Sequence, residues 1–167
     1  MARAARWIRL GRCDPEALGA ACRALAGAQT SRSAPIAVWT DGGESRRAFG
    51  VVVSRRFAPG RPVRWLSWAV SPLVASCRQL GAATYLEGEW LWLRGRRAAR
   101  ASVATAGACL VVTCAVPGSL PSPEKMESLL IACVEAQHGW QFENAWPDPR
   151  EHAAIAQARE AAAAAAA

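Results

Sequence analysis

The chain has 167 residues, enough for one domain with a substantial core, and 52% of them are hydrophobic while 20% are charged. This balance is typical of a globular protein, and no apolar run approaches the roughly 20 residues that cross a bilayer. The formal net charge is +7 and comes almost entirely from arginine, because Lys125 is the only lysine. Such a charge suits an acidic partner, a nucleotide, a coenzyme or a nucleic acid, but does not choose among them.

The six cysteines predict neither a zinc site nor a local disulfide. None forms a Cys-x-x-Cys pair, and the chain has only two histidines, so we expect no structural metal. Several cysteines fall at apolar positions of predicted helices, which is typical of small buried side chains in a reducing compartment. The arginine-rich amino terminus has no apolar core of secretory length, so we expect a cytoplasmic protein, with a mitochondrial presequence as the alternative.

The first third of the chain predicts a strand, a helix and two further strands. Residues 1–12 alternate basic and apolar side chains, as in an edge strand or an ordered arm. An N-cap acid followed by proline starts a helix at Asp14-Pro15, which continues to about Ala28. Strands are expected over residues 35–39 and 48–54, and the turn Asp41-Gly42-Gly43 lies between them.

The remaining elements follow the same rules. A basic loop is expected over residues 55–64, and Ser71-Pro72 predicts the start of a helix that ends at Gly81. Short strands follow over 83–87 and 89–94, and residues 103–116 supply one or two more. Ser122-Pro123 opens a third helix that ends at His138-Gly139. A segment rich in tryptophan and proline, 140–149, then leads to the last helix.

This order of elements predicts an α+β fold with a mixed or mostly antiparallel sheet flanked by helices, because the strands come in groups and do not alternate strictly with helices. We expect a single domain over residues 1–149. Residues 150–167 are predicted to form an alanine-rich C-terminal helix that frays at its end.

The stretch Leu91–Val116 carries the most distinctive pattern. Two runs of strand type meet at Gly95, which is a hairpin signal. Four cations gather at this bend, so they face either water or an anionic partner. In the strand before it, Trp90 and Trp92 share one face and can serve as anchors for a partner. We therefore predict that partner binding involves Arg94, Arg100, Trp90 and Trp92.

Two segments make the chain similar to a degenerate member of the biotin/lipoate protein ligase family, which includes lipoate ligases and octanoyltransferases. The first is Ile36–Gly43 followed by Phe49–Val53, which resembles the family's glycine loop between two strands. The second is Leu91–Arg100, which resembles its catalytic strand, where a glycine and a basic residue precede the catalytic lysine. The resemblance covers roughly residues 35–140 and implies the fold of the family's catalytic domain.

The position of the family's catalytic lysine falls at Arg97 in this chain. The ammonium group of that lysine contacts the acyl carbonyl and the phosphate, and the broad guanidinium fork of arginine cannot occupy the same point. Losing one such donor typically costs roughly 10²- to 10³-fold in rate. The resemblance therefore favours a non-catalytic protein and assigns no confident catalytic residue. Cys114, at the end of a predicted strand, is the one thiol that we would test as a nucleophile.

The resemblance also implies a remnant substrate pocket. Its predicted residues come from two neighbouring strands, so that the glycines meet Arg97 across one cavity: Trp39, Gly42, Gly43, Arg96 and Arg97. No cofactor is assigned unless the protein is active, in which case lipoate, octanoate or biotin is expected together with ATP.

The leading functional hypothesis is a non-catalytic, ligase-like protein that acts as a subunit or binding partner in a complex. Its partner would be another protein subunit or an acyl-carrier or lipoyl-type domain. One alternative is an active lipoate, octanoate or biotin transferase that acts on a lysine of a carrier domain. A further alternative is a basic nucleic-acid-binding module, because arginine and tryptophan also alternate over residues 61–68.

Overall fold

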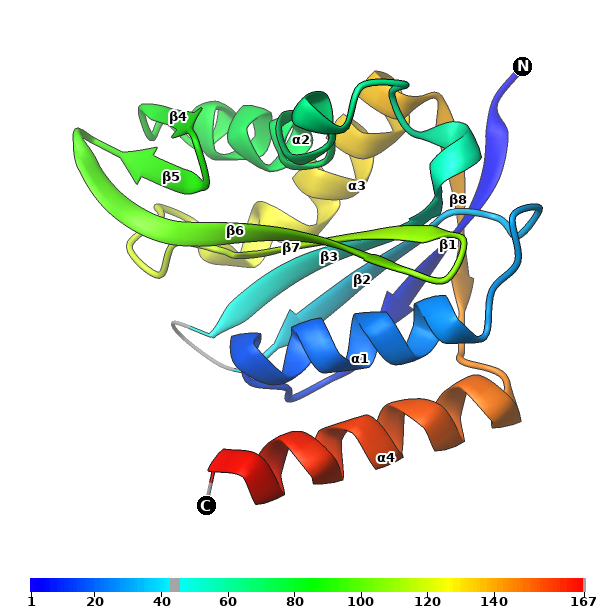
Figure 1. The fold of residues 1–167 in the computed structure, drawn as a ribbon. Coiled ribbons are helices and arrows are strands. Elements are labelled where there is room, and N and C mark those ends of the chain that lie inside the picture. Colours follow the sequence, from blue (N-terminus) through cyan, green and yellow to red (C-terminus); the bar gives the residue numbers. More distant parts are fainter. Residues whose placement is uncertain (43–45, 167) are drawn as a thin grey trace.

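The computed structural model, which describes residues 1–42 and 46–166, is built on an eight-stranded sheet of order β4-β5-β6-β7-β3-β2-β1-β8 (Figure 1). Adjacent strands are antiparallel except around β1, which runs parallel to both β2 and β8. The predicted α+β class with a mostly antiparallel sheet is therefore confirmed. The strands are β1 (Arg3–Arg9), β2 (Ile36–Asp41), β3 (Arg47–Ser54), β4 (Thr84–Glu87), β5 (Trp90–Leu93), β6 (Arg96–Ala106), β7 (Cys109–Ala115) and β8 (Trp140–Ala145).

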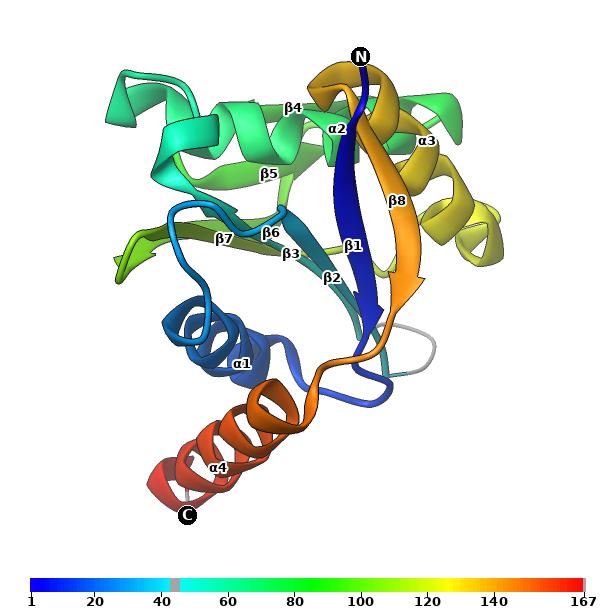
Figure 2. The same ribbon diagram turned by 90° about the vertical axis from the view of Figure 1, so that its right-hand side faces the viewer.

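Helices cover both faces of the sheet (Figures 1 and 2). On one face lie α2 (Trp65–Gln79) and α3 (Met126–His138), above a core that includes Trp7, Phe49 and Leu110. On the other face lies α1 (Pro15–Gly27), with α4 (Pro149–Ala166) packed against its outer side. Short 3₁₀ turns occupy Arg55–Phe57, Pro62–Arg64 and Pro123–Lys125. No helix in the described ranges is long and apolar enough to span a membrane.

The alternation of side chains along each strand explains the two cores. On β3, Phe49 and Val51 face α2 and α3, whereas Ala48 and Val52 face α1. Gly50 also points towards α1, where a Cβ atom would lie 2.8 Å from the Cys22 sulfur. The absence of a side chain at Gly50 therefore lets α1 approach the sheet closely.

The predicted start of the second helix at Ser71-Pro72 is wrong. Helix α2 begins at Trp65, and Pro72 lies inside it. An internal proline costs a helix roughly 3 kcal/mol, because it lacks an N–H group and its ring clashes with the preceding turn. The buried side chains Ala69, Val70 and Leu73 continue the apolar face of the helix across the proline. Packing against the sheet therefore outweighs the local penalty.

The strands β1 and β8 differ from the prediction. The first twelve residues were expected to form an edge strand or an arm, but β1 lies inside the sheet, between β2 and β8. Residues 140–145 belong to the segment to which the sequence assigned no helix or strand, and they form the edge strand β8. Trp140 and Phe142 of β8 pack against the core beneath α3, which gives this segment a buried face. Proline begins only at Pro147, after the strand has ended.

Candidate functional site

The β5–β6 hairpin carries the basic cluster predicted from the sequence. Arg94 and Gly95 form its turn with positive φ angles of 50° and 78°, a conformation that glycine adopts readily and arginine rarely. On β5, Leu91 and Leu93 are buried beneath α2, and the two tryptophans that alternate with them point to the opposite face. The predicted hairpin and its division into two faces are thus present.

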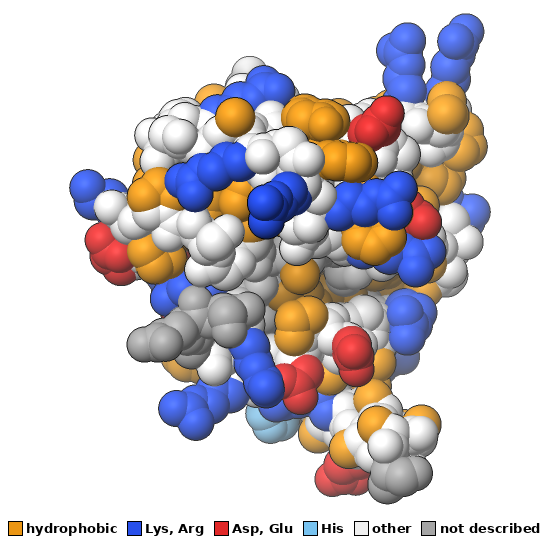
Figure 3. All heavy atoms as spheres, turned by 90° about the vertical axis from the view of Figure 1, so that its left-hand side faces the viewer, with side chains coloured by type: hydrophobic (Ala, Val, Ile, Leu, Met, Phe, Trp, Pro, Cys, Tyr) orange, Lys and Arg blue, Asp and Glu red, His pale blue; other side chains and the backbone are white. Residues whose placement is uncertain are grey.

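Arg97 lies over the tryptophans of this hairpin. Its guanidinium carbon is 4.9 Å from the ring centroid of Trp90 and 5.7 Å from that of Trp92. The phenol ring of Tyr85, on β4, stacks on Trp92 at 5.8 Å. A guanidinium so close to two indole faces is held by cation–π attraction. We call Tyr85, Trp90, Trp92, Arg97 and Arg100 the arginine–tryptophan surface. Figure 3 shows Lys and Arg side chains gathered on this face of the molecule.

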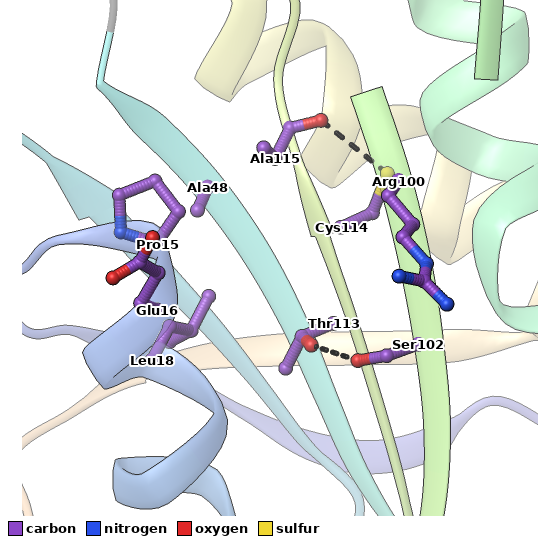
Figure 4. A pocket seen from close by; sticks show the side chains of 9 residues that line it. All are labelled: Pro15, Glu16, Leu18, Ala48, Arg100, Ser102, Thr113, Cys114 and Ala115. Carbon is purple, nitrogen blue, oxygen red and sulfur yellow. Dashed lines mark hydrogen bonds between the residues drawn. The ribbon is translucent and has the colours of Figure 1, made fainter. Parts of the chain in front are cut away.

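Arg100 connects this surface to a hollow beside α1. Its Nη2 donates to both carboxylate oxygens of Glu89, at 2.9 and 3.0 Å, and its guanidinium carbon is 5.9 Å from the Trp90 ring centroid. The hollow has a volume of about 290 Å³ (Figure 4). Its walls come from the first turn of α1 and from β3, β6 and β7, and its lining residues are Pro15, Glu16, Leu18, Ala48, Arg100, Ser102, Thr113, Cys114 and Ala115.

Hydroxyl groups line the β6–β7 side of this hollow, and α1 contributes two apolar side chains and Glu16. The hydroxyl groups of Ser102 and Thr113 hydrogen-bond each other at 2.8 Å across β6 and β7. Pro15 and Leu18 face them from α1 (Figure 4). The sequence analysis missed Glu16, Ser102 and Thr113. Ser102 could have been found, because it shares the Arg100 face of its strand at a spacing of two residues.

Gly42 lies beside a different hollow. This second hollow, of about 710 Å³, is lined by Gly42, Arg46 and Arg159 together with the start of α1. Arg97 lines a third hollow, of about 400 Å³, with Arg96 and the loop at Pro117. The expectation that the glycine turn and Arg97 meet across neighbouring strands is wrong, because β7 and β3 lie between β6 and β2. Gly43, also predicted for the pocket, lies outside the described residues.

The arrangement of strands and helices matches proteins of known structure. A lipoate protein ligase from Thermoplasma acidophilum with bound lipoic acid superimposes with a TM-score of 0.77 at 11% identity, over 95% of each chain. A structure from the bipartite lipoate protein ligase of the same organism, studied with its E2 lipoyl domain, gives 0.75 at 11% identity, over 95% of this chain and 92% of that chain. A biotin acetyl coenzyme A carboxylase synthetase from Helicobacter pylori gives 0.56 at 10% identity, over 81% and 75%.

The chain has the biotin/lipoate protein ligase fold. No protein-family model matches the sequence, and no curated protein does either. The match is therefore one of architecture. It confirms the catalytic-domain fold that the resemblance implied.

Trp39 does not face the α1-side hollow of this ligase fold. Its indole is buried on the α2–α3 side of the sheet, where its ring centroid is 6.4 Å from that of Trp7. Gly42 follows it by three residues, but the strand ends at Asp41. The structure thus places Trp39 in the core, Gly42 at the sheet end and Arg97 on the outer hairpin.

Cys114 also lies in the core of the ligase fold. Its thiol donates a hydrogen bond to the backbone carbonyl oxygen of Ala115 at 3.3 Å. Burial raises the pKa of the thiol to about 12. At neutral pH only about one molecule in 10⁵ would then carry the thiolate that a nucleophile needs. Burial also raises the pKa of Cys22 to about 12 and that of Cys77 to about 11. All six cysteines are free and buried, as expected for small apolar side chains.

His138 ends α3, as predicted, but its ring packs against two tryptophans. The ring centroids of Trp68 and Trp140 lie 4.3 and 4.9 Å from the imidazole, and neither ring nitrogen has a hydrogen-bond partner. Burial lowers the pKa of this histidine to about 4. The imidazole is therefore neutral at physiological pH and lies on the α2–α3 side, away from the α1-side hollow.

Proposed function

We propose that this chain is a non-catalytic protein with the ligase fold, which binds a partner protein through its arginine–tryptophan surface. The partner would be a lipoyl-type carrier domain or another subunit of a complex. The position of Arg97 carries the proposal: its guanidinium lies over Trp90 and Trp92 on the exposed hairpin. Arginine and tryptophan in such an arrangement are favoured anchors of protein interfaces.

The chemistry at the family's lysine position supports this function. A ligase needs a compact cation that reaches the acyl carbonyl and the phosphate as charge moves onto the leaving group. Arg97 keeps the charge, but its planar fork is engaged with two indole rings. The buried thiols Cys77 and Cys114 are poor substitutes, because burial raises the pKa of both.

The charge of the hairpin favours an acidic partner. Arg94, Arg96 and Arg97 are exposed, and so is Arg100, whose charge is balanced by Glu89. Clustered cations of this kind speed the encounter with an acidic protein and lose strength as salt increases. A structural neighbour was studied with its E2 lipoyl domain, so a lipoyl-type domain is the first partner to test.

One observation favours the second candidate, an active acyltransferase. The hollow of about 290 Å³ beside α1 combines the Arg100 cation with the hydroxyl groups of Ser102 and Thr113. Neighbours with the same fold are described with bound lipoic acid and with bound ATP. In this candidate, lipoate, octanoate or biotin would occupy the hollow together with ATP, and transfer would go to a lysine of the carrier domain.

A turnover assay separates the two candidates. The protein is incubated with ATP, an acceptor domain and radiolabelled lipoate, octanoate or biotin, and separately with octanoyl-carrier protein. We expect no labelled acceptor and no labelled adenylate. ATP-dependent labelling that disappears in Arg97→Ala would replace the non-catalytic function with the enzymatic one.

A binding assay tests the partner surface directly. Fluorescence anisotropy with a labelled lipoyl domain should give saturable binding that Arg97→Glu weakens by roughly tenfold or more. Arg32→Glu is the matched control, because Arg32 is exposed on the loop that precedes β2. Absence of binding, or equal weakening by both variants, would contradict the proposal for this partner. Single-stranded DNA that binds instead, with steep salt dependence, would support the nucleic-acid alternative.

A further inference from the structure

Half of β6 has an uncovered side. Its first residues, Arg96–Arg100, pair with β5, and Ala101–Ala106 pair with β7 on the other side. The backbone N–H of Ala101 donates to the carbonyl of Glu89 at 2.7 Å, and there the contact with the β5 hairpin ends. Within the described ranges, no strand pairs with the outer side of residues 102–106. Figure 1 shows this part of β6 at the front of the sheet.

The backbone of Val103 and Thr105 points outward from this edge. In an antiparallel ladder, both polar backbone groups of a residue point to the same side, and alternate residues point to opposite sides. Because the N–H of Ala101 points away from β7, the N–H and C=O groups of Val103 and Thr105 do so too. These groups are free to form the ladder of one more strand, as in β-strand addition.

An apolar groove runs along the same edge. It has a volume of about 650 Å³, and its lining includes Val63, Leu66, Leu86 and Val103. Val63 is 86% exposed and Val103 is 45% exposed. A strand paired with β6 would place alternate side chains beside Val103, on the face that carries the groove. Main-chain pairing and side-chain burial would then occur together.

The charges around the groove decide between two occupants. A second copy of the chain could pair through its own β6, but each copy carries a net charge of +7, so two copies repel each other. Arg61 and Arg64, which flank Val63 in the sequence, are both exposed. Glu89 also lines the groove, but its carboxylate accepts two hydrogen bonds from Arg100. Acidic side chains on the incoming strand would therefore complement Arg61 and Arg64. An acidic strand from another protein therefore fits better than a second copy.

We propose that an extended segment of a partner protein adds a strand to the free edge of β6 at residues 102–106. Its alternate residues are apolar and fill the groove at Val63, Leu66 and Val103, and acidic residues flank them. This docking edge is distinct from the arginine–tryptophan surface and does not depend on the function proposed for it.

A selection experiment tests the inference with the whole chain. A phage library of random nonapeptides is selected on the immobilised protein, and enriched peptides are synthesised with a fluorescent label. We expect sequences that alternate apolar residues and carry Asp or Glu at their ends. N-methylation of alternate peptide bonds should abolish binding, because it removes the donors of the ladder.

Two variants of the protein address the two halves of the site. Val63→Glu places a like charge in the groove and should weaken binding at least tenfold without altering the fold, because Val63 is exposed. Val103→Pro removes an outward N–H group, at a position where an edge strand tolerates proline. Trp146→Glu is the control, because Trp146 is 85% exposed and does not line the groove.

The outcomes are separable. Loss of binding in Val63→Glu and in Val103→Pro, with retention in Trp146→Glu, would support the added strand. The inference would be overturned if selection on the wild-type protein enriched no more peptides than selection on the Val103→Pro protein. It would also be overturned if N-methylated peptides bound as well as unmodified ones. A dimer of the wild-type protein in sedimentation that Val63→Glu dissociates would also overturn it, because the second copy would then be the occupant.

Discussion

The carboxylate of Glu151 accepts two hydrogen bonds from the guanidinium of Arg6, 145 residues earlier in the chain, at 2.9 and 2.8 Å. The same carboxylate accepts hydrogen bonds from the Gln29 amide at 2.6 Å and from the backbone N–H of Asp148 at 2.9 Å. The side-chain carboxylate of Asp148 in turn accepts a hydrogen bond from the backbone N–H of Glu151 at 2.8 Å, so the two residues form a reciprocal cap at the start of α4. One buried acid thus joins α4 to β1 and to the end of α1.

Removing this acid should destabilise the whole protein. Glu151→Gln leaves the guanidinium of Arg6 without its anion in a site where the Glu151 side chain is 2% exposed. Breaking a buried ion pair on one side costs roughly 3–5 kcal/mol, and the part-exposed Arg6 reduces the expected loss to about 2–4 kcal/mol. Urea unfolding of the wild type and of Glu151→Gln measures this loss of stability. Arg46→Ala, which breaks the exposed pair with Asp14, should cost less than about 1 kcal/mol.

The same carboxylate should make stability fall at acidic pH. Hydrogen bonds from Arg6 lower the pKa of Glu151 from 4.5 to about 2. Its contribution is therefore complete above pH 4.5, and it is lost as the pH falls towards 2, because the unfolded chain takes up the proton first. The full effect is about 3 kcal/mol. Unfolding free energies of Glu151→Gln between pH 5 and pH 2 should show a flatter profile than the wild type. A parallel profile would contradict this assignment.

His138 should produce a second pH dependence at higher pH. Burial lowers its pKa from 6.5 to about 4, so the folded protein resists protonation that the unfolded chain accepts. Stability is thus highest above pH 6.5 and decreases as the pH falls from 6.5 to 4, by roughly 1–3 kcal/mol for this partly buried ring. His138→Phe should remove the decrease. It should also be neutral or stabilising at pH 7, because neither imidazole nitrogen has a partner.

The contact between Gly50 and Cys22 predicts a coupled pair of mutations. Gly50→Ala would place a methyl group 2.8 Å from the Cys22 sulfur in a tightly packed region, at a cost of roughly 1–3 kcal/mol. Replacing Cys22 with alanine provides space, so the double variant should be more stable than Gly50→Ala alone. Thermal unfolding of the wild type, both single variants and the double variant completes the cycle. Strict additivity would show that α1 moves away from the sheet instead.

The buried thiols should react only when the protein unfolds. Burial raises the pKa values of Cys22, Cys77 and Cys114 to between about 11 and 12, and thiols in such sites are inert. Reaction with a chromogenic disulfide at pH 8 should therefore be slow in buffer and complete in urea. Fast reaction of Cys114 in the folded protein would reopen its assignment as a nucleophile.

The elements that the sequence predicted well are those in which local pattern and tertiary packing agree. The α1 start at Pro15 and the β5–β6 turn at Gly95 follow from residue types that favour one backbone conformation. The α2 start failed because Ser71-Pro72 has the residue types of a helix start, whereas burial of Ala69 and Val70 extends the helix backwards. Residue preferences for helix starts do not include contacts with strands that are distant in the sequence.

The site was predicted less well than the fold, because its geometry depends on strand order. The sequence predicted the turn after residue 41 and the hairpin turn at Gly95, but not the two strands, β7 and β3, that lie between β6 and β2. The sheet face towards which Trp39 points depends on the strand register, because a shift of one residue would move its side chain from the core to the side of the hollow. The alternation on β5 was sufficient to assign Trp90 and Leu91 to opposite faces, because Leu91 is buried and Trp90 is not.

The position of β1 between two parallel neighbours has a consequence for biosynthesis. Arg3 pairs with Trp140, so β1 is completed by a strand that is synthesised much later. Until residues 140–145 emerge, one side of β1 presents unpaired N–H and C=O groups, which are prone to pair with other chains. Contacts this distant in sequence also slow folding. A nascent chain arrested before β8 should thus bind chaperones, and emergence of residues 140–145 should allow the sheet to close.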